Sequence, residues 1–69
     1  MITADQIRAG RAMLGWSQAK LASESGMTRE AVVRIEGSKS DPRVSSMKKI
    51  QDAMESAGLV FLPGGVRLG

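Results

Sequence analysis

Apolar residues recur every three or four positions in several stretches of the chain, the spacing typical of amphipathic helices. A first helix is expected over about residues 4 to 14, because Thr3 and Gln6 have the spacing of a capping box. A last helix is expected to end at Gly58. Its inward positions repeat at intervals of three and four residues: Val44, Met47, Ile50, Met54 and Ala57. This pattern predicts a mainly helical domain.

Between these helices lie two short helical stretches separated by one tight turn. Ser17 and Thr28 are good N-caps for the two stretches, and Gly26 is placed to end the first of them in a left-handed conformation. The inward face of the second stretch consists of Val32, Ile35 and Glu36. Because only Gly26, Met27 and Thr28 separate the two helices, they must cross steeply. This geometry is the helix-turn-helix, in which the second helix can enter a DNA major groove.

A set of spaced motifs runs through most of the chain, over roughly residues 3 to 58. Its members are Gly15-Trp16-Ser17-Gln18, Leu21-Ala22, Gly26-Met27-Thr28, Arg34-Ile35-Glu36 and Pro42, together with Arg11. Taken together they resemble the Cro and lambda-repressor-like helix-turn-helix family, also called the xenobiotic-response-element family of bacterial regulators. The resemblance implies an all-α, compact four-helix domain that binds specific DNA sequences, usually as a dimer on a two-fold site. The family's glycine usually stands where Ser38 is found, one position after Gly37.

Arg11 occupies the inward face of the first predicted helix, between Ile7 and Leu14. A charge on an inward face needs a partner, and Glu36 lies on the inward face of the third helix. The resemblance implies that this arginine and this glutamate form an ion pair that clamps the first helix to the third. The alternative is that the Arg11 side chain extends to solvent, and we expect the pair instead.

The outward face of the third predicted helix carries the candidate residues for reading DNA bases: Thr28, Arg29, Glu30, Val33 and Arg34. Arginine presents a planar fork that matches the two acceptors of guanine. Glu30 can accept from the cytosine amino group, and Val33 can contact a thymine methyl group. The alternative is a solvated helix with a local pair between Glu30 and Arg34, which have four-residue spacing. Both interpretations stay open, because such a pair can reopen on DNA.

Contacts to the DNA backbone are expected around the rim of this helix. Gln18 stands at the amino end of the second helix and resembles the family glutamine that binds a phosphate. The amino terminus of a helix itself favours an anion. The loop after the third helix supplies the other candidates for phosphate contacts, which are Ser38, Lys39 and Arg43. Phosphate contacts from Lys48 and Lys49 are an alternative, and we expect these two lysines instead to keep the last helix soluble.

The helical spacing of apolar residues ends at Gly58, so we divide the chain into a DNA-binding domain of residues 1–58 and a β tail of residues 59–69. Two short strands are predicted around a Pro63-Gly64 turn. This pair suits a type II turn, whose twist fits a tight hairpin badly. We therefore expect the tail to pair with a second copy and to form a homodimer through Leu59, Val60, Phe61 and Leu62, while a looser hairpin packed on the last helix is the alternative.

Composition and charge narrow the functional classes. The chain has 69 residues, enough for one small core, and a net charge of +3 that suits double-stranded DNA without requiring it. It has no cysteine and no histidine, so we expect no metal, no cofactor, no catalytic residue and no enzyme activity. An antitoxin-like module that binds another protein, such as a toxin, through its apolar tail remains the alternative function. No apolar stretch is long enough to span a membrane and no signal peptide is seen, which predicts a cytoplasmic protein.

Overall fold

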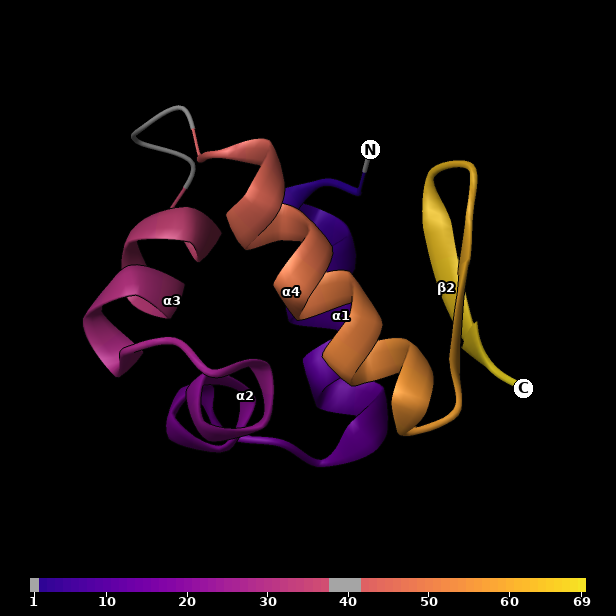
Figure 1. Ribbon diagram of the computed structural model, residues 1–69. Coiled ribbons are helices and arrows are strands. Elements are labelled where there is room, and N and C mark those ends of the chain that lie inside the picture. The colour runs from indigo at the N-terminus through magenta and orange to yellow at the C-terminus, as the bar shows by residue number, and fades with distance from the viewer. Residues whose placement is uncertain (1, 38–41) are drawn as a thin grey trace.

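The computed structural model describes residues 2–37 and 42–69, which form four helices followed by a two-stranded hairpin (Figure 1). The elements are α1 (Ala4–Leu14), α2 (Gln18–Ser25), α3 (Arg29–Glu36), α4 (Val44–Ser56), β1 (Leu59–Leu62) and β2 (Gly65–Leu68). The fold class predicted from the sequence, a compact four-helix domain with a short carboxyl-terminal β element, is confirmed.

The helices begin and end where the capping residues predict. Thr3 and Gln6 form a capping box, in which each side chain accepts a hydrogen bond from the backbone N–H of the other. Ser17 and Thr28 each accept one backbone N–H of the first turn of α2 and α3. Gly26 ends α2 with a φ of 71°, a left-handed conformation that favours glycine. Local chemistry therefore accounts for the helix-turn-helix.

A single core draws residues from every element. Its fully buried side chains are Ile7, Leu21, Val32, Ile50 and Met54, and Leu59 of β1 joins them with 2% of its surface exposed. Gly10 of α1 lies where the hairpin approaches most closely, since a Cβ there would be 2.5 Å from Leu59 Cδ2. The small residue thus allows β1 to pack directly on α1.

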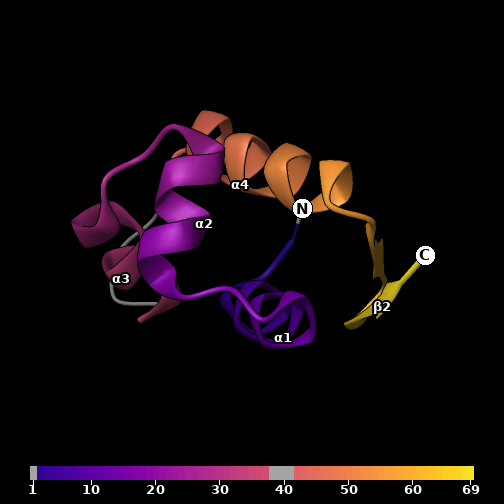
Figure 2. The same cartoon turned by 90° about the horizontal axis from the view of Figure 1, so that it is seen from below.

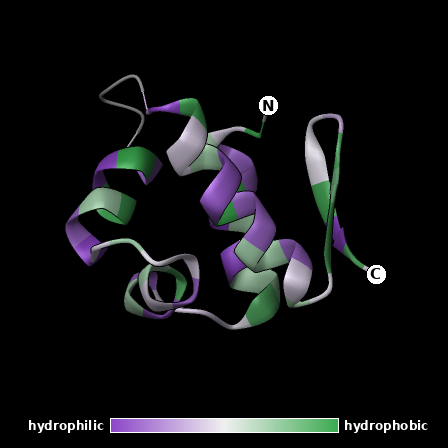
Figure 3. Ribbon diagram, viewed as in Figure 1, coloured by the Kyte–Doolittle hydropathy of each residue, from purple (hydrophilic) through white to green (hydrophobic). Residues whose placement is uncertain are grey.

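The inward pattern predicted for α4 holds in its middle and fails at both ends. Met47, Ile50 and Met54 are buried, and Figure 3 shows the hydrophilic side of α4 turned outward. Val44 and Ala57 were both expected to face inward, but Val44 is 70% exposed and Ala57 is exposed as well. Val44 precedes the turn of α4 that contacts the core and Ala57 follows the last residue of the helix, so helical periodicity alone misplaces both.

The tail folds back on its own chain, so the prediction that a tight hairpin is disfavoured is wrong. β1 and β2 pair antiparallel around the two-residue loop Pro63-Gly64, with Leu59 opposite Leu68 and Leu62 opposite Gly65. Gly64 has a φ of 74°, as the type II turn expected for this dipeptide requires. The strands are only four residues long and are held from outside, which offsets the poor match of turn and strand twist.

Gln6 of α1 provides part of this outside support. Its Nε2 donates to the carbonyl oxygens of Leu62 and Gly65, at 2.6 Å and 3.0 Å, on the two sides of the hairpin turn. Its Oε1 accepts from Thr3 N at 2.8 Å. One buried side chain therefore caps α1 and fixes the hairpin to it.

Replacing Gln6 with alanine is expected to lower the free energy of unfolding by about 1 to 3 kcal/mol, because the two carbonyl groups lose their shared donor. Urea melts would measure the loss. Gln51→Ala is the matched control, since among the described residues the Gln51 amide bonds only to the exposed Glu55 side chain. Equal losses from both glutamine variants would mean that Gln6 does not hold the hairpin.

The hairpin and α3 lie at opposite ends of the body. α3 is at one side in Figure 1 and the strands are at the other, and the view from below in Figure 2 shows the same separation. α1 and α4 fill the space between them. Leu59 and Phe61 pack toward this body, so Val60 and Leu62, which alternate with them, face away from it.

Candidate nucleic-acid interface

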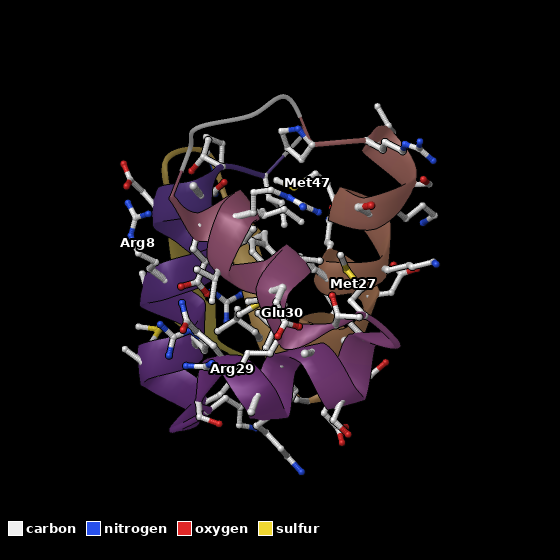
Figure 4. The ribbon with its side chains drawn as sticks, turned by 90° about the vertical axis from the view of Figure 1, so that its left-hand side faces the viewer. Arg8, Met27, Arg29, Glu30 and Met47 are labelled. Atoms are coloured by element: carbon white, nitrogen blue, oxygen red, sulfur yellow. The ribbon has the colours of Figure 1, made fainter. Side chains whose placement is uncertain are left out.

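α3 has one buried face and one exposed face, as its sequence predicts. Val32, Ile35 and Glu36 are buried. The five candidate base-reading residues, Thr28, Arg29, Glu30, Val33 and Arg34, are all exposed. Figure 4, in which α3 lies in front of the body, shows Arg29 and Glu30 on the near side. The structure therefore brings all five candidates together on one surface.

Glu30 and Arg34 do not form the local ion pair that four-residue spacing allows. Elsewhere in the described residues that spacing does produce pairs, at Lys20–Glu24 and Lys48–Asp52, with distances of 3.4 Å and 3.5 Å. The polar ends of Glu30 and Arg34 are thus not bound to each other.

Arg11 and Glu36 form an ion pair between α1 and the end of α3. Arg11 Nε lies 2.8 Å from Glu36 Oε2, and Arg11 Nη2 donates to Glu36 Oε1 at 3.1 Å, so the contact is bidentate. Glu36 is only 4% exposed, whereas the Arg11 side chain keeps 23% of its surface. Arg11 Nη1 also donates to the Trp16 carbonyl oxygen at 2.9 Å. The pair joins α1, α3 and the segment that leads into α2.

Gln18 also contacts this pair, which the sequence did not predict. Its Nε2 donates to Glu36 Oε1 at 3.2 Å, and the Gln18 side chain is only half-buried. Gln18 is the first residue of α2, so its amide group lies between a helix amino terminus and a buried carboxylate. No local signal in the sequence indicates this contact, because the two residues meet only when α2 packs on α3.

Arg8 is a second residue that sequence reasoning missed. Its guanidinium donates to the main-chain oxygen of Glu36 and pairs with Asp5 (Figure 4). The three-residue spacing of Asp5 and Arg8 could have revealed their ion pair. The contact with Glu36 depends on the packing of α1 against α3. Arg8 and Arg11, one turn apart, therefore bind the same residue through its backbone and its side chain.

The rim on the other side of α3 is formed by the start of α4. Arg43 is exposed at the N-cap position of α4 and makes no side-chain cap. A surface hollow of about 410 Å³ lies between Arg34 and Arg43, over Ile35 and Pro42. Ser38 and Lys39, the other candidates for phosphate contacts, lie outside the described residues.

Comparison with known proteins identifies this arrangement. The helix-turn-helix family model matches residues 7–57. The chain belongs to this family. The match agrees with the resemblance to the Cro and lambda-repressor-like regulators, which bind DNA. Among curated proteins, none matches the chain.

The helix-turn-helix of this family corresponds here to α2, the turn at Gly26 and α3, so the exposed face of α3 belongs to the DNA-binding motif. The family is one of regulators and is not typically enzymatic. The match ends before β1, and the hairpin therefore lies outside the part of the chain that shows the family.

The described residues add two findings about other classes of site. They contain no group of three or more histidine, cysteine, aspartate or glutamate side chains that could hold a metal ion. None of their helices is both long enough and apolar enough to cross a membrane.

Proposed function

We propose that this helix-turn-helix protein is a transcriptional regulator that binds a specific operator as a dimer, with α3 in the major groove. The exposed face of α3 carries the proposal. It presents two arginines, one carboxylate and one aliphatic side chain, a set that can read guanine, cytosine and thymine by hydrogen bonds and methyl contacts.

The surroundings of α3 suit a DNA backbone. Gln18 lies at the amino end of α2 and Arg43 at the amino end of α4, so a phosphate donor flanks α3 on either side. The net charge of +3 favours association with a polyanion. We assign backbone contacts to Gln18 and Arg43, and we extend them to Ser38 and Lys39 of the connecting loop.

The proposal includes a dimer. Because the tail folds into a hairpin, fewer of its side chains are available for a contact with a second copy. Leu59 and Phe61 pack against the chain's own core. Of the four tail residues predicted for the interface, only Val60 and Leu62 face away from the body. We therefore propose these two as the tail's contribution to a contact with a second copy.

A second candidate function is an antitoxin-like module that binds another protein. The exposed leucines of the hairpin favour it, since Leu62 and Leu68 expose 40% and 55% of their surfaces. Replacing both with serine separates the two candidates. This change should leave binding to a single DNA half-site intact and should abolish capture of a protein partner if that role is correct.

Selection of bound sequences from a random DNA pool tests the main proposal. We expect enrichment of a palindromic sequence, because a two-fold dimer reads the same half-site twice. A pool in which no sequence is enriched would contradict sequence-specific binding. A single enriched half-site without its inverted copy would contradict the dimer alone.

On the selected site, Arg34→Ala is expected to cost about 1 to 3 kcal/mol of binding free energy and to relax the base preference, since it removes a base contact. Gln18→Ala should weaken binding to all sequences alike. Titrations of matched and mismatched duplexes would measure both. Arg67→Ala is the control, because Arg67 is exposed on β2 at the other end of the body. Full affinity and preference after loss of both Arg29 and Arg34 would show that α3 does not read DNA.

A further inference from the structure

We propose that Glu36 is a positioning residue for the DNA backbone contact, because it holds the Gln18 amide in the orientation that a phosphate requires. This inference rests on the proposed function and adds a role for the buried ion pair. Under this proposal the Arg11–Glu36 pair joins α1 to α3 and also fixes the orientation of the Gln18 side-chain amide at the start of α2.

Gln18 Nε2 donates a hydrogen bond to Glu36 Oε1 at 3.2 Å. A carboxylate can only accept hydrogen bonds, so it binds the NH₂ group of a neighbouring amide and repels the amide oxygen. Glu36 therefore decides which end of the Gln18 amide is held in place.

One N–H donor of the Gln18 amide remains free. Its NH₂ group has two N–H donors, and Glu36 occupies one of them. The other N–H stays available at the amino end of α2, where the helix terminus favours an anion. A phosphate oxygen accepts such a donor, whereas an amide turned the other way would present its oxygen to the phosphate and repel it.

Glu36 itself is held in place by two arginines. Arg11 binds both of its carboxylate oxygens, and Arg8 binds its main-chain oxygen. With 4% of its surface exposed, Glu36 has no room to change its partners. The Gln18 amide is therefore anchored to a rigid point before DNA arrives, which lowers the ordering cost of binding.

A double-mutant cycle on DNA affinity tests this role. In the wild-type background, Gln18→Ala should weaken binding to every duplex by roughly tenfold, the loss of one hydrogen bond to a charged group. In the Arg11→Met, Glu36→Leu background the amide has no anchor, so the same alanine substitution should weaken binding less than about twofold. Thermal melts of each variant would confirm that the domain is folded.

A second background covers the case in which that double variant does not fold. In Glu36→Met position 36 offers no acceptor, and the Arg11 side chain, which keeps 23% of its surface exposed, can turn to solvent. The Gln18 amide then loses its anchor while Arg11 is still present. Here too, Gln18→Ala should have less than about a twofold effect.

The outcomes separate this inference from the proposed function. An equal loss from Gln18→Ala in the wild-type and altered backgrounds would overturn the positioning role and leave DNA binding intact. No effect of Gln18→Ala in the wild type would overturn it as well. A wild-type protein that binds no DNA would instead contradict the proposed function itself.

Discussion

Replacing Arg11 with alanine is expected to lower the free energy of unfolding by about 3 to 5 kcal/mol, the largest loss from a single charged residue in the described structure. The reason is that Glu36 stays buried without its bidentate partner. Little water can reach a carboxylate that is 4% exposed, so its desolvation is not offset. Thermal and urea melts would measure the loss.

The double change Arg11→Met with Glu36→Leu should recover much of this stability, because apolar side chains of similar size can replace a buried ion pair. Lys48→Ala is the control. Lys48 is 73% exposed and pairs with a carboxylate that is 58% exposed, so its loss should stay within about 1 kcal/mol. Equal losses of a few tenths of a kcal/mol from Arg11→Ala and Glu36→Ala would show that the pair is solvated.

The second large effect is expected at Leu59, where alanine should lower the free energy of unfolding by about 2 to 5 kcal/mol. Leu59 is 2% exposed and packs where Gly10 makes room for it, so its removal leaves a cavity beneath the hairpin. Leu68 lies directly opposite Leu59 in the strand pairing and is 55% exposed. Leu68→Ala should therefore change stability by less than about 0.5 kcal/mol.

This contrast decides whether the hairpin is part of the folded core. Similar small losses at Leu59 and Leu68 would mean that the helices fold without it. If the contrast holds, truncation after Gly58 is a poor test of dimerisation, because it removes Leu59 together with Phe61 and Val66, which also pack on the core. Single changes at Val60 or Leu62 test the tail contact without this loss.

Much of the fold could be predicted from the sequence because it depends on local chemistry. The caps at Thr3, Ser17 and Thr28 each involve residues three apart, and the inward face of α3 follows from helical periodicity. The exposed face of α3 followed from the same pattern. A reader of the sequence alone could thus place the candidate base-reading residues on one surface.

The rest depends on contacts between distant parts of the chain. Gln6 reaches carbonyl groups more than fifty residues away, and the hairpin that these contacts stabilise was expected to pair with another chain. The Gln18 contact with Glu36 likewise arises only when α2 packs on α3. Turn preference at Pro63-Gly64 argued against the hairpin, and tertiary contacts outweighed it.

The placement of the hairpin and α3 at opposite ends of the body restricts the symmetry of any dimer on DNA. If two copies met face to face through their hairpins, the two-fold axis would be perpendicular to the line that joins the hairpin to α3 within one copy. The rotation would then turn the second α3 to the far end of the dimer, so the pair would bridge two separate duplexes. Two α3 helices can occupy successive major grooves of one duplex, about 34 Å apart, only when the axis runs along that line. Protomers on a palindromic site would then touch along their flanks, and Val60 and Leu62 could meet the second copy only at the neighbouring edges of the two hairpins, on the side away from the DNA.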